Sequence, residues 1–235
     1  MVIDGAKTGH HDIADHIRPF MQNANVDRIF YCHGFASHFD ANKDKVRALS
    51  TAAIVDGNTV DYTLPPHQVL ESFQKALSAR RNYLVVGTSM GGFFAAWLGT
   101  ELGLPYVAIN PAVTPSHSLR KHIGEGGTHY GKRFTLREET GEAYNTLPFR
   151  IDGQGLVALD MGDKVVDPQV TLEAIDGNLP VVTFPGGSHR FDHMHKLTAV
   201  IQSVFFKPST SKHKFLSSAE NTDPENKSRV KRNVK

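Results

Sequence analysis

NYLVVGTSMGGFFAAWLGTELG, residues 82–103, runs from an apolar segment through a glycine-rich turn into a second apolar segment. The first part, Asn82–Gly87, carries no charge and is typical of a strand buried in a sheet. The second part follows a helical pattern and ends at Gly103, a residue type that commonly terminates helices. The stretch therefore predicts a buried strand that turns directly into a helix.

The turn itself, Gly87–Gly91, fits the pattern G-x-S-x-G, and Gly92 follows it. A strand that becomes a helix at once strains the corner residue, and small neighbours let the two segments approach each other. Ser89 would then stand exposed at a helix N-terminus, whose dipole favours the negative charge that develops during nucleophilic attack. We predict that Ser89 is a nucleophile; the alternative is a glycine-rich turn without chemistry.

Apolar segments predict six strands, at residues 28–35, 51–57, 82–87, 104–110, 155–163 and 179–187. Helical patterns separate several of them, and a last helix is expected at 190–206. Strands that alternate with helices imply right-handed crossovers and a mostly parallel sheet, which binds ligands beyond the carboxyl ends of its strands. We predict an α/β protein with a compact α/β-hydrolase fold, a mostly parallel sheet of about six strands and helices on both faces.

A serine nucleophile needs a general base, which follows the last strand in this fold. His189 lies in PGGSHRFD, directly beyond the strand predicted at 179–187. His193 and His195 are close alternatives, but they fall inside the predicted last helix, where surface positions are more common. His189 is the predicted base.

The acid that orients the base should follow the preceding strand. Asp163 comes after Gly162 and before an apolar pair, the usual setting of this acid. Asp160 still belongs to the strand, and Asp167 precedes a proline as a helix N-cap would. We favour Asp163 over Asp167, which gives the chain order Ser, Asp, His of α/β-hydrolases.

An oxyanion hole needs two N–H donors. We predict the backbone N–H of Met90, next to the nucleophile, and the backbone N–H of Phe35, in the loop after the first sheet strand. His33 in this loop is interpreted as structural. Cys32 is interpreted as a small buried strand residue rather than a nucleophile, because it lies inside an apolar run.

Five sequence blocks resemble the YqiA/YcfP-like esterase family of the α/β-hydrolase superfamily. They are YCHGFASHFDANK (31–43), VVGTSMGGFFAAWLG (85–99), AINPAVTPSHSL (108–119), MGDKVVD (161–167) and GGSHRF (186–191). The resemblance covers about Ile29 to Phe205 and keeps the order of the blocks. It implies a Ser89, Asp163 and His189 triad that cleaves carboxylic esters or acyl thioesters through an acyl-enzyme, with no cofactor and no metal.

Residues 111–150 fit no strand and begin at the ligand-binding end of the sheet. We predict a small cap or lid insertion, and a plain connecting loop is the alternative. The apolar residues expected to line an acyl pocket are Val113, Leu119, Ile123, Tyr130, Phe134 and Leu136. The predicted organisation is an N-terminal extension (1–27), a hydrolase domain (28–206) and a basic disordered tail (207–235).

The composition is that of an ordinary globular protein, with 40% hydrophobic and 21% charged residues. The tail at 207–235 holds eight Lys or Arg and three acids, which gives +5; since the whole chain is +2, the remainder is −3. Nucleic acid is therefore expected at most at the tail. No apolar run is long enough to cross a membrane, which needs about 20 residues, so a membrane partner is not expected.

The N-terminus lacks a signal-peptide pattern, and Cys32, the one cysteine, has no partner for an intramolecular disulfide. These features indicate a cytoplasmic protein. The family resemblance implies a small-molecule ester or thioester as its substrate. Two other classes stay open: a catalytically silent binding protein with the same fold, and a metal site at His10, His11, Asp12 and His16. The metal site has no second cluster to support it.

Overall fold

A seven-stranded parallel sheet forms the centre of the computed structural model, which describes residues 1–21, 26–77 and 82–206. The strand order is β1-β9-β8-β5-β4-β2-β3, and each neighbouring pair is parallel. The strands are β1 (Val2–Asp4), β2 (Arg28–Cys32), β3 (Ile54–Gly57), β4 (Tyr83–Thr88), β5 (Tyr106–Ile109), β8 (Gly155–Asp160) and β9 (Val181–Phe184). The predicted α/β fold class and all six predicted strands are confirmed.

Helices cover both faces of the sheet because its strands are apolar on both sides. One apolar cluster joins the sheet to α1 (His10–Ile17), α2 (Asp44–Leu49) and α8 (Met194–Phe205). The other cluster joins it to α3 (Pro66–Leu77), α4 (Met90–Leu102) and α7 (Pro168–Ile175). In β2, Ile29 belongs to the first cluster and Phe30 to the second, as the alternation of side chains along a strand requires.

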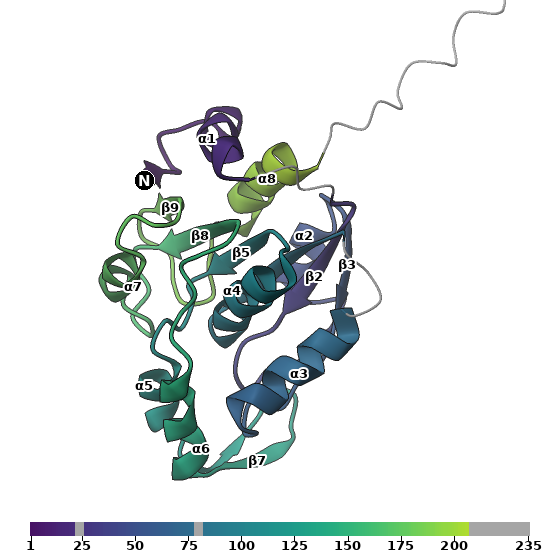
Figure 1. Cartoon of the computed structure of the whole chain (residues 1–235), viewed down its shortest axis with the longest axis vertical. Helices are drawn as coiled ribbons and strands as arrows, with labels where there is room; N and C mark the ends of the chain where they lie inside the picture. The colour runs from purple at the N-terminus through teal and green to yellow at the C-terminus, as the bar shows by residue number, and fades with distance from the viewer. Residues whose placement is uncertain (22–25, 78–81, 207–235) are drawn as a thin grey trace, which may run out of the picture.

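The seventh strand comes from the segment interpreted as an N-terminal extension. β1 pairs with β9, with Val2 opposite Val181 and Ile3 opposite Val182. Helix α1 follows, packs beside α8 (Figure 1) and leads into the 3-10 helix η1 (Arg18–Phe20). A strand of three residues at a sheet edge is too short to give a periodic pattern, so the sequence predicted six strands instead of seven.

The segment 111–150 contains a hairpin, so the expectation that it holds no strand is wrong. Its elements are α5 (Pro115–Arg120), β6 (Gly124–Gly127), β7 (Arg133–Leu136), α6 (Glu138–Ala143) and the 3-10 helix η2 (Tyr144–Thr146). Strands β6 and β7 pair antiparallel. Glycine disfavours strands, which hides β6 in the sequence; at Gly126 a Cβ would collide with the Phe134 ring. Figure 1 shows this cap at the end of the molecule opposite α1 and α8.

The chain after β9 differs from the prediction, because the last helix begins at Met194 rather than at residue 190. Phe191 has φ 61°, which interrupts any helix. Residues 185–193 therefore form a loop at the carboxyl end of the sheet. The six-residue helix α2 was also not predicted. The basic tail at 207–235 lies outside the described residues.

Candidate active site

Ser89 occupies the corner between β4 and α4, with φ 58° and ψ −121°, angles that side-chain-bearing residues rarely adopt. Two glycines allow this corner. A Cβ on Gly87 would collide with the carbonyl group of Gly91, and a Cβ on Gly91 would collide with the carbonyl oxygen of Cys32. The structure thus contains the strained strand-to-helix turn that the G-x-S-x-G pattern predicts.

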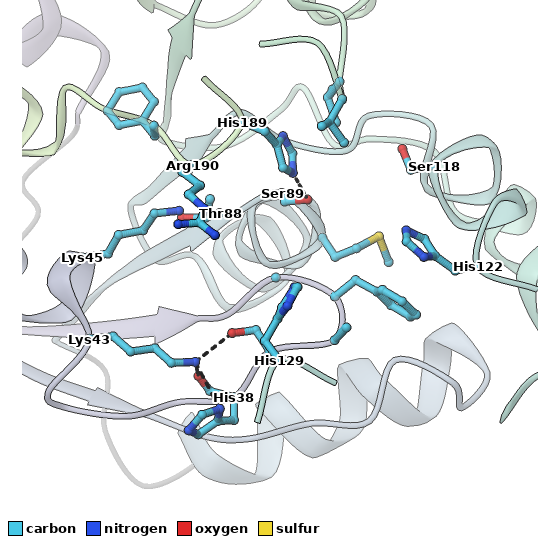
Figure 2. Close-up of a pocket in the computed structure, with 18 of the residues that line it drawn as sticks. His38, Lys43, Lys45, Thr88, Ser89, Ser118, His122, His129, His189 and Arg190 are labelled. Carbon is cyan, nitrogen blue, oxygen red and sulfur yellow. Dashed lines mark hydrogen bonds between the residues drawn. The ribbon is translucent and has the colours of Figure 1, made fainter. Parts of the chain in front are cut away.

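Ser89, His189 and Asp163 form one continuous chain of hydrogen bonds. The distance from Ser89 Oγ to His189 Nε2 is 3.0 Å, a contact drawn in Figure 2. On the other side of the ring, His189 Nδ1 lies 2.7 Å from Asp163 Oδ2. With the proton on Nδ1, the imidazole donates to the carboxylate and accepts from the serine hydroxyl. The loops after β4, β8 and β9 bring the three side chains together.

Asp163 is held as a carboxylate by its neighbours. Its side chain is only 1% exposed. Besides the contact with His189, it accepts the backbone N–H groups of Val165 at 2.7 Å and Val166 at 3.1 Å. Burial alone raises the pKa of Asp163, but these hydrogen bonds outweigh it and lower the pKa below its usual range. An ionised carboxylate therefore faces His189 Nδ1.

The other acid candidates have different roles. Asp167 accepts the backbone N–H of Gln169 at 2.9 Å, which confirms the predicted N-cap of α7. Asp160, at the end of β8, is fully buried, and its Oδ1 lies 2.7 Å from His193 Nδ1, with which it forms a hydrogen bond. His195 is exposed on α8.

The expectation that His193 lies on a helix surface is wrong. It is the N-cap of α8, and its ring stacks on Phe184 with the centroids 4.9 Å apart. Its Asp160 partner also accepts the backbone N–H groups of Ser188 at 3.2 Å and Asp192 at 2.6 Å. A Cβ on Gly187 would collide with this carboxylate. Asp160 and His193 therefore fasten the loop that carries His189.

Asn110, at the end of β5, completes this fastening. Its side-chain Oδ1 accepts the backbone N–H of Asp160 at 2.9 Å, and its Nδ2 donates to the carbonyl oxygen of Ser188 at 3.0 Å. Its φ of 41° and its burial indicate a fixed position. This role of Asn110 was not predicted, although Asn110 stands in the block Ala108–Leu119 that carries the family resemblance.

The loop after β2 lies directly against the Ser89 corner. A Cβ on Gly34 would stand 3.5 Å from the Cβ of Ser89, so the loop approaches to van der Waals distance. Phe35 belongs to this loop and Met90 follows Ser89 in the chain, and their backbone N–H groups stay the predicted oxyanion donors. The backbone N–H of His129, from the cap, donates to the carbonyl oxygen of Ala36 at 2.8 Å and ties the cap to this loop.

His33 and Cys32 are structural, as interpreted from the sequence. His33 Nδ1 lies 2.8 Å from the carbonyl oxygen of Gly34, and its Nε2 accepts the backbone N–H of Val60 at 3.1 Å. Burial lowers the pKa of His33 to about 4, so the ring is neutral and both nitrogens are used. Burial raises the pKa of the Cys32 thiol, which keeps it protonated.

Ser89 and His189 open into a cavity of about 1170 Å³ between the sheet and the cap. Among the six apolar cap residues predicted to line a pocket, Leu119, Ile123 and Phe134 do so. The prediction is wrong for the other three: Val113 and Leu136 are buried in the core, and Tyr130 lines a smaller neighbouring cavity. The Phe35 ring contacts the rings of His122 and Phe134, at centroid distances of 4.9 Å and 5.3 Å, and forms an aromatic wall.

Within residues 1–21, 26–77 and 82–206, no group of three or more His, Cys, Asp or Glu side chains is arranged to hold a metal ion. At the suggested metal site, His16 Nδ1 instead lies 2.7 Å from the carbonyl oxygen of Asp12. None of the helices in the described part of the chain combines the length and the apolar character needed to cross a bilayer.

The parallel sheet, the strained serine corner and the loops that converge on it define an α/β-hydrolase fold. Residues 28–206 match the model of the uncharacterised protein family UPF0227, and the chain belongs to this family. This confirms the family resemblance. A UPF0227 protein of Shewanella sp. (strain MR-7) is 27% identical over 177 residues, which are 71% of this chain and 92% of the relative. A UPF0227 protein of Serratia proteamaculans is 25% identical over 173 residues, with the same two coverages.

Solved structures share the fold at low sequence identity. Est1E from Butyrivibrio proteoclasticus superposes with a TM-score of 0.60 at 15% identity, covering 79% of this chain and 89% of that protein. The monoacylglycerol lipase of Paleococcus ferrophilus gives a TM-score of 0.56 at 12% identity, covering 77% and 96%. At these identities the likeness establishes the α/β-hydrolase fold.

Proposed function

We propose that this protein is a serine hydrolase that cleaves carboxylic esters or acyl thioesters. The observation that carries the proposal is the unbroken chain from Ser89 Oγ through His189 to the buried Asp163 carboxylate, at the floor of a large cavity. A serine that is only structural needs neither a strained corner nor a histidine at 3.0 Å.

The reaction would begin with attack of Ser89 Oγ on the acyl carbon while His189 Nε2 takes the hydroxyl proton. Asp163 holds the imidazole in the tautomer with Nδ1–H and stabilises the imidazolium that forms. The backbone N–H groups of Phe35 and Met90 would stabilise the negative oxygen of the tetrahedral intermediate. Return of the proton from Nε2 to the leaving alcohol or thiol leaves an acyl-enzyme, which water then hydrolyses with the same base.

The apolar side of the cavity supports an acyl group as substrate. Leu119, Ile123 and Phe134 from the cap and Phe35 from the loop after β2 line it, and apolar surfaces of this kind bind acyl chains by excluding water. Structural neighbours include the esterase domain of a Rhodothermus marinus protein, a monoacylglycerol lipase and a thioesterase domain from the curacin biosynthetic pathway. These names support ester and thioester chemistry for this chain.

A substrate panel tests the proposal. The purified protein and its Ser89→Ala variant would be given 4-nitrophenyl esters from acetyl to palmitoyl, and acyl thioesters of the same chain lengths. We expect turnover of part of the panel by the protein and none above background by the variant. Equal rates for the two proteins, or no turnover of any ester or thioester, would contradict the proposed function.

A further inference from the structure

One end of the active-site cavity is lined by two cations, Lys45 from α2 and Arg190, the residue after His189. Figure 2 shows their side chains converging beside Thr88, on the side of Ser89 away from His122. Lys45 is partly buried and Arg190 is exposed. Two positive groups on the same side of a cavity repel each other, and an anion bound between them would offset that repulsion.

Neither cation is neutralised by a direct contact with the described part of the chain. No hydrogen bond or ion pair joins the Lys45 ammonium or the Arg190 guanidinium to any described residue, unlike Lys43 nearby, whose ammonium donates to Ser37 Oγ and the His38 carbonyl oxygen, both at 2.9 Å. Burial and, to a smaller extent, the charge of Arg190 lower the pKa of Lys45 to about 8, against the opposing effect of nearby carboxylates.

The acids near Lys45 are engaged elsewhere. Asp160, Asp192 and Asp163 all act to raise the pKa of Lys45, which places them in its surroundings. Asp160 and Asp163 accept three hydrogen bonds each from the loops described above. Asp192 accepts the hydroxyl of Ser188 at 2.9 Å. Each carboxylate thus serves the local loop structure and leaves the ammonium without a bonded partner.

The opposite end of the cavity has an apolar wall of Phe35, Met90, Leu119 and Phe134, with polar side chains of the cap, among them Ser118 and His122, beside it. His122, which stacks against Phe35, marks that end in Figure 2, and Ser89 lies between it and the two cations. A substrate that fits both ends has an apolar part on one side of the scissile bond and a negative charge on the other.

We infer that Lys45 and Arg190 form an anion-binding subsite for a carboxylate or phosphate group on the substrate. The inference rests on the proposed function. Because Arg190 follows His189, the residue proposed to protonate the leaving group, the anion belongs to the leaving alcohol or thiol. The apolar acyl group then lies against the aromatic wall.

Three matched esters test the subsite: 3-carboxyphenyl, 3-phosphonophenyl and 3-carbamoylphenyl butyrate. The first two carry an anion on the leaving group, and the carbamoyl ester is a neutral compound of similar shape. A charge-assisted contact is expected to raise kcat/KM for a charged ester about tenfold over the neutral one. The faster of the two charged esters identifies carboxylate or phosphate as the preferred group.

Variants localise the effect. We expect Lys45→Met and Arg190→Met each to bring the charged-to-neutral ratio of kcat/KM close to one. Lys121→Met, which removes a cation from the cap side of the same cavity, should keep the ratio. Because each ratio is measured within one protein, a partly destabilised variant still reports selectivity, and Arg190→Met provides the test if Lys45→Met does not fold.

The outcomes separate the subsite from the proposed function. Hydrolysis of the neutral ester with a charged-to-neutral ratio near or below one in the unmodified protein would overturn the subsite and leave the hydrolase standing. A preference that Lys121→Met abolishes as completely as Lys45→Met would also overturn it, since the effect would come from the general field of the cavity. No hydrolysis of the three esters by a protein that turns over other members of the ester and thioester panel would overturn the subsite alone, and no turnover of any ester or thioester would overturn both.

Discussion

Two Asp–His pairs lie side by side at the carboxyl end of the sheet, and in both the carboxylate is 2.7 Å from His Nδ1. In the first pair, Asp163 and His189, the far nitrogen of the ring faces Ser89 Oγ at the floor of a cavity. In the second pair, Asp160 and His193, the ring stacks on Phe184. The same contact thus serves two different purposes.

The difference lies in what each ring and carboxylate face. The Asp160 carboxylate accepts hydrogen bonds from two backbone N–H groups of the loop that carries His189, in addition to its contact with His193. The Asp163 carboxylate accepts two backbone N–H groups of the turn after β8. It also orients the His189 ring, whose Nε2 lies within hydrogen-bond distance of Ser89 Oγ. An Asp–His contact alone therefore does not identify a catalytic site. The group that faces Nε2 of the histidine distinguishes a candidate catalytic pair from a structural one.

Removal of the serine should have the largest effect on activity. Ser89→Ala leaves both Asp–His pairs intact but deletes the nucleophile, so kcat for an activated ester should fall by about four orders of magnitude or more. The melting temperature should change little, because the substitution removes one hydroxyl. Ester kinetics together with a thermal melt check both parts, and near-normal kcat would refute the assignment of Ser89.

Matched substitutions of the two acids break the comparison directly. Asp163→Asn should lower kcat by about three to four orders of magnitude, because an amide favours the wrong tautomer of His189. Asp160→Asn should instead lower the free energy of unfolding by roughly 2–4 kcal/mol, because it removes charge-assisted hydrogen bonds in a buried position.

Both quantities, kcat and the free energy of unfolding in denaturant, are measured for Asp163→Asn and for Asp160→Asn. Each variant serves as the reference for the other, since both replace a buried carboxylate by an amide in the same region. If Asp160→Asn were the slower enzyme and Asp163→Asn the less stable protein, the two roles would be reversed.

The pH dependence of the preference for charged esters tests the surroundings of the first pair, Asp163 and His189, which faces the cavity. Lys45, which lines the cavity that Ser89 and His189 face, has a pKa lowered to about 8 by burial and by Arg190, against the opposing effect of Asp160, Asp192 and Asp163. It is charged below that pH and neutral above it. The charged-to-neutral ratio of kcat/KM should therefore decrease between pH 7 and about pH 9.

Measuring a ratio cancels the pH dependence of the triad, which is common to both esters. Lys45→Met should give a low ratio that does not change over the same range. A ratio that stays high and constant in the unmodified protein would exclude Lys45 as the group that binds the anion.

The smallest expected effect on activity comes from a substitution in the aromatic wall of the cavity that Ser89 and His189 face. Phe134→Ala removes part of the aromatic wall, so the preferred acyl chain length should shift, with kcat/KM changing a few-fold for the longest chains. Tyr130→Ala is the matched control, because Tyr130 lines the neighbouring cavity. An identical chain-length profile for Phe134→Ala would reduce the cap to a connecting segment.

Local patterns in the sequence predicted the parts of the molecule that depend on local structure. The Ser89 corner follows from glycines within a few residues of it, because the collisions that exclude a side chain at Gly87 and Gly91 are local. His189 and Asp163 follow from their places after β9 and β8. Most of the six strands were predicted because they are nearly continuous apolar runs in a sheet covered on both faces. β3, at the sheet edge, has no buried residue and was predicted from the short apolar segment before Asp56.

The parts that were not predicted depend on contacts distant in sequence or on weak local signals. Strand β1 has three residues and is defined by its pairing with β9 at the other end of the chain. His193 appeared to belong to a helix because the φ of 61° at Phe191 leaves no mark in an apolar pattern. Lys45 and Arg190 are distant in the sequence and line the same cavity only in the folded chain. A lysine in a short helix gives no sequence pattern that predicts a binding site.

Labelling with a small fluorophosphonate tests the central claim most directly, since it reports the reactivity of the serine without knowledge of the substrate. Mass spectrometry of the labelled protein would locate the adduct and measure its rate of formation. The account predicts one adduct, on Ser89, that forms at least 100-fold more slowly in His189→Ala, as an order-of-magnitude expectation for loss of the general base, and at a near-normal rate in His193→Ala. An adduct on another residue, or equal rates in the unmodified protein and His189→Ala, would contradict it.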